Sequence, residues 1–218
     1  MIGKGKSISH GVAALEYDLA KEINGQAVAT EIARHELYGC TGAEMVQEMK
    51  PYHIDFPNVK NNCLRFEVSP SIEESATFTD ADWAELGNDF MQRMGLANHQ
   101  YIIIRHSGTE SKKEQAHLHI LANRVSLSGE LYRDNWIGKK ATEAANAIAK
   151  ERNFVQSQDI GKVNKAEIKE AMDGVLKKMQ GFDFTKFKEE LGKRGFKVRE
   201  ARASTGKLNG YYVTARSG

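Results

Sequence analysis

Apolar positions recur with helical spacing in the first part of the chain. One side of a helical wheel collects the apolar residues Val12, Leu15, Leu19 and Ile23. This stripe predicts an amphipathic helix over residues 12–23, which Asn24-Gly25 should end. Tyr17 lies opposite the stripe, beside Lys21, so the predicted helix leaves this tyrosine without a role in the core.

The remaining patterns predict a mixture of helices and strands. Thr41, with Glu44 three residues later, has the spacing of a capping box and indicates a helix start. Helical spacing predicts helices over residues 41–49, 79–95, 139–153, 165–179 and 183–194. Alternating or continuous apolar runs predict strands over residues 62–69, 100–105, 116–125, 131–133, 196–203 and 208–215. We therefore expect an α+β fold with an antiparallel sheet flanked by helices.

Composition and charge divide the chain into two parts. The net charge is −6 over residues 1–138 and +8 over residues 139–218. We expect a core over residues 1–154 and a basic C-terminal segment of helices and a β-hairpin over residues 155–218. The excess of positive charge favours a polyanionic partner, although a solvated basic helix gives the same count. Because the chain ends at Gly218 directly after a predicted strand, we expect the native protein to extend further.

The same counts exclude several classes of protein. With 40% hydrophobic and 28% charged residues among 218, the chain is neither disordered nor collagen-like. Two cysteines, Cys40 and Cys63, provide neither a disulfide framework nor a four-thiolate zinc site. The sequence contains no signal-peptide pattern and no apolar run of about 20 residues, so we expect a cytoplasmic protein without membrane insertion.

Three histidines belong to the two central predicted strands. His117 and His119 are two positions apart on one strand, so their side chains point to the same face, about 7 Å apart. His106 ends the preceding strand, and a hairpin would bring it beside the other two. Three neutral imidazoles form a metal site with open coordination positions, able to polarise a phosphoryl or carbonyl group. Structural histidines are the alternative interpretation.

The segment HQYIIIRHSGTESKKEQAHLHILANRVSLSGELY resembles the histidine motif of mobilization relaxases, the HUH-type DNA nickases of plasmids and mobile elements. The sequence AALEY, ending at Tyr17, resembles the family's N-terminal helix with its tyrosine, and Ser69 in FEVSPS falls where the family has a serine at a strand end. The TDADWAELGNDFMQRMGL helix and the C-terminal FTKFKEELGKRGFKVREARASTGKLNGYYV also have counterparts, so the resemblance covers most of the chain.

The resemblance implies a reaction and its partners. Tyr17 would attack a phosphodiester of single-stranded DNA at an origin of transfer and form a covalent 5′-phosphotyrosine. The three histidines would hold a divalent ion, Mg²⁺ or Mn²⁺, with other transition metals possible in vitro. Accessory mobilization proteins and the transfer machinery are the expected partners. Tyr38 and His10 are the rival nucleophiles.

Further residues are expected around the DNA. We expect DNA contacts from Ser69 and from three residues near the histidines in sequence: Arg105, Asn123 and Arg124. A structural role is the alternative for Asn123 and Arg124. The adjoining segments contain further basic residues that would hold single-stranded DNA, namely Lys4, Lys6 and Arg133. Trp136 would either stack on a base or pack in an interface between the core and the C-terminal segment.

The chain differs from many family members in having Gly108 where they have an acidic residue, and its loop between the histidines is longer. Glu110 or Glu114 would then orient an imidazole or take a proton, unless both are ordinary solvated loop residues.

Other functions use the same residues. A rolling-circle replication initiator would share the chemistry. A metal-dependent phosphohydrolase would use the histidines to activate water and form no covalent adduct. A pure DNA-binding module would show salt-sensitive affinity without metal binding or nicking.

Overall fold

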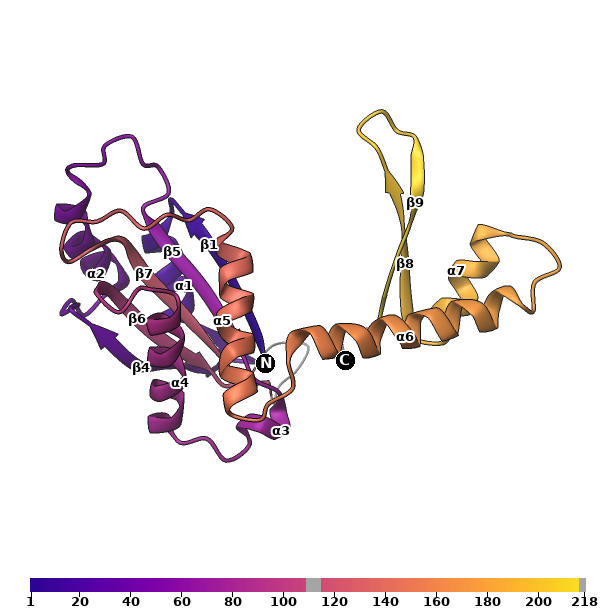
Figure 1. Cartoon of the computed structure of the whole chain (residues 1–218), viewed down its shortest axis with the longest axis horizontal. Coiled ribbons are helices and arrows are strands. Elements are labelled where there is room, and N and C mark those ends of the chain that lie inside the picture. The colour runs from indigo at the N-terminus through magenta and orange to yellow at the C-terminus, as the bar shows by residue number, and fades with distance from the viewer. Residues whose placement is uncertain (109–114, 216–218) are drawn as a thin grey trace. The chain divides into compact units, whose positions relative to one another are not determined.

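Five antiparallel strands form the sheet at the centre of Met1–Ser157, the first of two units into which the chain divides (Figure 1). The structure is a computed structural model that describes residues 1–108 and 115–215. Across the sheet the strands follow the order β1 (Ile2–Ile8), β5 (Cys63–Ser69), β7 (His117–Ser126), β6 (His99–His106) and β4 (Ala29–His35). The predicted α+β class and the hairpin of the two histidine strands, β6 and β7, are confirmed.

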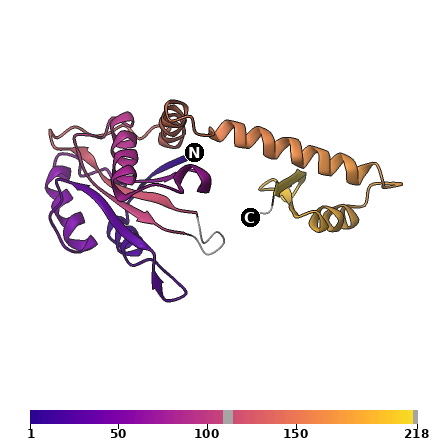
Figure 2. The same ribbon diagram turned by 90° about the horizontal axis from the view of Figure 1, so that it is seen from below.

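Helices cover both faces of the sheet, as Figures 1 and 2 show. On one side, here called the α4 face, α4 (Asp80–Arg93) and α5 (Ile137–Glu151) share a hydrophobic cluster with Leu118, Ile120 and Ala122 of β7, and α5 packs on β1. On the other side, the α1 face, α1 (Gly11–Leu19) and α2 (Gly42–Met49) pack on Leu121. Because side chains alternate along a strand, His119 belongs to the α1 face together with Leu121.

Capping boxes begin several of these helices. Thr41 accepts a hydrogen bond from the backbone of Glu44 and begins α2, as predicted, and the 3₁₀ turn η1 (Lys50–His53) follows that helix. Ser71 begins the short helix α3 (Ile72–Ser75), and Thr79 begins α4 in the same way. Local side-chain chemistry therefore sets these three helix starts.

The first helix is shorter than predicted, and it buries a different stripe. It ends at Leu19, and Ile23 instead lies in the small hairpin of β2 (Glu22–Ile23) and β3 (Gln26–Ala27). Asn24 and Gly25, with φ of 54° and 74°, form the two-residue turn of that hairpin. Val12 is 39% exposed, so it does not belong to the core. The buried residues of α1 are Gly11, Ala14, Leu15 and Asp18.

Two further differences concern strands. Strand β4 was not predicted, because a register shift between Glu31 and Ala33 interrupts the alternation of its side chains. The strand predicted at 131–133 is reduced to a single bridge between Val125 and Leu131.

The second unit, Gln158–Gly218, has a hydrophobic cluster of its own. It contains most of α6 (Ser157–Leu176), with α7 (Phe184–Lys193) and the hairpin of β8 (Phe196–Arg202) and β9 (Leu208–Ala215). Phe187 and Leu191 of α7 pack with Val198 of β8 and with Ala171 and Val175 of α6. Among the described residues of both units, no helix combines the length and apolarity needed to cross a bilayer.

Candidate active site

The three histidines meet on the α1 face of the sheet. His106 is the direct cross-strand partner of His117, and His119 follows two positions later on β7. The ring centroid of His106 lies 4.4 Å from that of His119 and 5.4 Å from that of His117. One nitrogen of each ring lies within 4.8 Å of the others, so this cluster is able to hold a metal ion.

Hydrogen bonds orient two of the three rings. Nε2 of His106 donates to the backbone oxygen of Asp18 at 2.7 Å, and Nδ1 of His117 donates to the backbone oxygen of Gln115 at 3.1 Å. A carbonyl oxygen only accepts, so each ring keeps its other nitrogen as a lone-pair donor. Such outer contacts are typical of metal-binding histidines.

The nitrogen geometry suits a bound ion. The Nε2 atoms of His117 and His119 are 3.0 Å apart. Two nitrogens at about 2.1 Å from one ion have this separation when they subtend about 90°. The donor set is therefore compatible with one divalent ion.

Burial favours the neutral imidazole, the form that binds metals, at His106 and His119. Desolvation lowers the pKa of His106 below its usual value, against the opposing effect of its hydrogen bond to Asp18. Desolvation also lowers the pKa of His119 to about 2, with further contributions from His106, His117 and Arg65.

A buried ion pair that was not predicted lies beside the histidines. Asp18 is only 2% exposed, and its carboxylate accepts from Nε of Arg65 at 3.0 Å. A second guanidinium nitrogen of Arg65 lies 3.4 Å from Nδ1 of His119, and Oδ1 of Asp18 lies 3.8 Å from the same atom. Burial raises the pKa of Asp18, while Arg65 opposes that shift. The signal in the sequence was helical spacing: Asp18 shares the buried stripe of Gly11, Ala14 and Leu15.

Tyr17 precedes this aspartate on α1. Its side chain is 57% exposed, and its hydroxyl accepts a hydrogen bond from Nζ of Lys21 at 2.7 Å. The Lys21 ammonium therefore lies next to the phenol oxygen, where negative charge would develop if the phenol lost its proton. Of the rival nucleophiles, His10 is exposed at the start of α1. Tyr38 is 77% exposed and donates to Glu36, whose carboxylate raises the pKa of the phenol.

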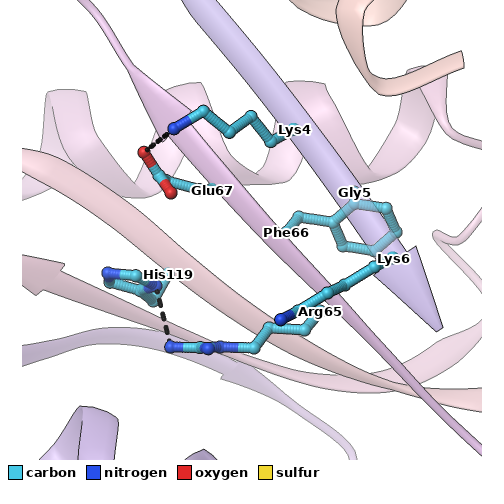
Figure 3. Close-up of a pocket in the computed structure, with 7 residues that line it drawn as sticks. All are labelled: Lys4, Gly5, Lys6, Arg65, Phe66, Glu67 and His119. Atoms are coloured by element: carbon cyan, nitrogen blue, oxygen red, sulfur yellow. Dashed lines mark hydrogen bonds and ion pairs between the residues drawn. The ribbon is translucent and has the colours of Figure 1, made fainter. Parts of the chain in front are cut away.

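A basic groove extends from the cluster across the neighbouring strands (Figure 3). Its lining residues are Lys4, Gly5, Lys6, Arg65, Phe66, Glu67 and His119. Lys4 pairs with Glu67 at 2.8 Å, whereas Lys6 has no ion-pair partner within residues 1–108 and 115–215. The groove thus places cationic side chains next to His119.

Ser69 is linked to the cluster through Gln115. Nε2 of Gln115 donates to the hydroxyl of Ser69 at 3.3 Å and to the backbone oxygen of Pro70 at 2.6 Å. Since the backbone oxygen of Gln115 accepts from His117, this glutamine connects the end of β5 with the histidine cluster.

The other predicted DNA contacts lie away from the histidines. Arg105 alternates with His106, so it faces the α4 side, where it pairs with Asp80. Asn123 is completely buried, with hydrogen bonds to His53 at 2.7 Å and to Gln100 at 2.9 Å. Arg124 belongs to the far end of β7 and pairs with Asp134 at 2.6 Å. Sequence proximity to the histidines was misleading, because strand alternation and length separate these side chains from the cluster. Glu110 and Glu114 lie outside the described residues.

Comparisons with a family model and with solved structures gave matches. The family model described as "Relaxase: MobA/VirD2-like, nuclease domain" matches residues 17–154. Among solved structures, the chain is similar to the conjugative relaxase TrwC in complex with OriT DNA. The metal-free TrwC structure matches at 10% identity and a TM-score of 0.42, over 95% of this chain and 74% of that chain. The metal-bound one matches at 11% identity and a TM-score of 0.41, with the same coverage.

No curated protein sequence matches the chain. The family model spans more than half of the 218 residues and includes the tyrosine and all three histidines. The chain therefore belongs to the MobA/VirD2-like relaxase nuclease-domain family and is a DNA-nicking enzyme.

Proposed function

We propose that this enzyme nicks single-stranded DNA at an origin of transfer, with Tyr17 as the nucleophile and His106, His117 and His119 as the metal site. The observation that carries the proposal is the hydrogen bond between His106 and Asp18, which joins the helix carrying Tyr17 to the histidine cluster. Asp18, the residue after the proposed nucleophile Tyr17, is thereby hydrogen-bonded to the proposed metal ligand His106.

The step is a transesterification that conserves the energy of the phosphodiester. The phenol oxygen of Tyr17 bonds to the scissile phosphorus, and the bond from phosphorus to the 3′-oxygen breaks. The phenol loses a proton and the departing 3′-oxygen gains one, so the products are a 5′-phosphotyrosine and a free 3′-hydroxyl. Lys21 stabilises the negative charge that forms on the phenol oxygen. Religation reverses each of these changes.

A divalent ion bound by the three histidines would withdraw charge from the non-bridging phosphate oxygens. We propose Mn²⁺ or Mg²⁺ as the physiological ion. Imidazole donors suit transition metals better than Mg²⁺, so Mn²⁺ should bind more tightly.

The DNA is proposed to follow the basic groove. Lys6 and Arg65 offer cationic groups beside His119, and Ser69 offers a hydroxyl on the same sheet face. Arg105 and Arg124 instead hold protein elements through Asp80 and Asp134. Asn123, buried in the core, has a structural role.

The second unit supports DNA binding by charge. Residues 158–218 carry 14 basic and 8 acidic side chains. We propose that this unit adds affinity without supplying chemistry. We further propose that the enzyme works in the cytoplasm with accessory mobilization proteins and the transfer machinery, as the likeness of the sequence to relaxases implies.

The test is incubation of the full chain with single-stranded DNA containing the origin, with Mn²⁺ or Mg²⁺, followed by a denaturing gel. A covalent protein–DNA band in metal but not in EDTA is expected. Cleavage to free 5′-phosphate ends without this band would identify a phosphohydrolase and overturn the proposal. Binding without cleavage in any metal would reduce the chain to a DNA-binding module.

A further inference from the structure

One of the two tryptophans of the chain lies on the surface. Trp136 is 80% exposed, whereas Trp83 is 2% exposed within the core. Trp136 also has left-handed backbone angles, φ 58° and ψ 27°, directly before α5. Such angles are uncommon for a bulky residue that is not glycine, so the surrounding loop must hold them.

That loop is fastened by Arg124. Its guanidinium donates to the backbone oxygens of Asn61 at 2.9 Å and Tyr132 at 3.2 Å, in addition to its ion pair with Asp134. Lys140 adds a hydrogen bond to the backbone oxygen of Arg133 at 2.8 Å. The exposed indole is therefore carried by a loop with several fixed points.

Basic residues flank Trp136 on both sides in the sequence. Arg133 is exposed and precedes Trp136 by three residues. Lys139, three residues after Trp136, has a side chain that is 72% exposed and forms a solvent-exposed ion pair with Glu143 at 3.7 Å. Asp134, the one acidic residue between positions 133 and 140, is neutralised by Arg124. A flat apolar ring between cations suits a ligand that has unpaired bases on an anionic backbone, which is single-stranded nucleic acid.

The start of α5 also lies next to β1, one of the strands that line the basic groove. A side chain at Gly138 would lie 3.5 Å from the backbone oxygen of Gly5, and Thr142 donates to the backbone oxygen of Gly3 at 3.1 Å. Gly5 lines the groove together with Lys4, Lys6 and His119. Trp136 thus lies two residues before the contact of α5 with β1, which is made on the sheet face opposite to the side chains of Lys4 and Lys6.

We propose that Trp136 stacks on a base of the single-stranded DNA at a point beyond the basic groove, with Arg133 and Lys139 near the flanking phosphates. This inference rests on the proposed function, because it assumes that the groove carries the DNA. It assigns to Arg124 a positioning role: the arginine holds the loop that presents the indole.

Fluorescence of the full chain tests the stacking. The probe is a 20-nucleotide single strand of mixed sequence, titrated in EDTA so that no cleavage occurs. Trp136 emission should be quenched saturably as DNA binds, since Trp83 is buried and contributes a constant background. Trp136→Phe retains a ring and should bind within about threefold of wild type without the quenching. Trp136→Ala should bind between about 5-fold and 100-fold more weakly, the range of base–aromatic stacking.

Tyr38→Ala is the matched control, because Tyr38 is equally exposed but lies beside Glu36 and Glu48. It should leave the affinity unchanged. Unchanged emission at saturating DNA, or wild-type affinity of Trp136→Ala, would overturn the proposal. The covalent-adduct gel is read separately: quenching without any adduct would retain the stacking site and reject the proposed nicking reaction.

Discussion

The backbone oxygen of Asp18 accepts a hydrogen bond from Nε2 of His106 at 2.7 Å. Because Asp18 directly follows Tyr17, this contact fastens the helix of the proposed nucleophile to a proposed metal ligand. The carboxylate of the same aspartate binds Arg65, which reaches His119. Asp18 thus contacts the histidine site through both its backbone and its side chain.

Replacing Tyr17 by phenylalanine should abolish the covalent adduct, by at least about a hundredfold, because only the nucleophilic oxygen is removed. The side chain is 57% exposed, so the fold, the metal affinity and the DNA affinity should change less than about twofold. Adduct formation is measured on denaturing gels, and metal binding by calorimetry.

His117→Ala should impair both metal binding and nicking, whereas Tyr17→Phe should impair nicking alone. An adduct that persists in Tyr17→Phe would place the nucleophile elsewhere, with Tyr38 and His10 next to be tested.

The Asp18–Arg65 pair should support the metal site. Asp18→Asn keeps the backbone contact to His106 but removes the carboxylate charge beside Arg65 and His119. Loss of such an outer contact typically costs about 10- to 100-fold in metal affinity or activity. Calorimetric titration with Mn²⁺ measures the affinity, and thermal unfolding in EDTA separates it from a loss of stability.

Asp89→Asn is the matched control for Asp18→Asn. It removes the carboxylate charge from the ion pair of Asp89 with Arg93 on α4, which is more exposed than the pair of Asp18 with Arg65. If both variants bind Mn²⁺ as tightly as wild type, the buried pair has no part in the metal site.

The stability of the metal-free chain should fall as the pH is lowered from 7 to 5.5. Desolvation lowers the pKa of His99, His106 and His119 in the fold, whereas in the unfolded chain they titrate near about 6.5. Below that pH the unfolded chain binds more protons than the folded one, so acidification favours unfolding. Each group contributes on the order of 1 kcal/mol per pH unit.

Urea unfolding in EDTA at several pH values measures this effect. A free energy of unfolding that stays constant or rises toward pH 5.5 would contradict the burial of these imidazoles. Added Mn²⁺ should restore part of the loss, since a ligand of the folded state stabilises it.

Removal of residues 158–218 should weaken DNA binding and flatten its salt dependence. The deleted unit has a net charge of +6, and each lost phosphate contact lowers the slope of log K against log salt by about 0.7 for single strands. A cut after Ser157 retains the contacts of Val155 with the N-terminus and with Glu74. Some nicking of a short oligonucleotide should remain. An unchanged affinity and slope in a folded core would show that the basic charge is only a solvated surface.

The sequence by itself determined the elements whose signals are local. The capping box of Thr41 and Glu44 predicted the start of α2, and period-two alternation predicted that His117 and His119 share a face. Strands that follow one another in the chain commonly pair, so the position of His106 beside the other two histidines was also predictable. These features depend on neighbours within a few residues or on the next strand.

The tertiary structure alone decided the surroundings of the cluster. Asp18 and Arg65 are 47 positions apart. The pairing of β5 with β7 places Arg65 beside His119, and the packing of α1 on the sheet adds Asp18. Arg105 is adjacent to His106 in sequence but faces the other side of the sheet, where Asp80 binds it. Asn123 became a core residue because His53 and Gln100, from distant segments, satisfy its amide. Partners for buried polar groups come from wherever the chain packs, and a local sequence pattern contains no information about that choice.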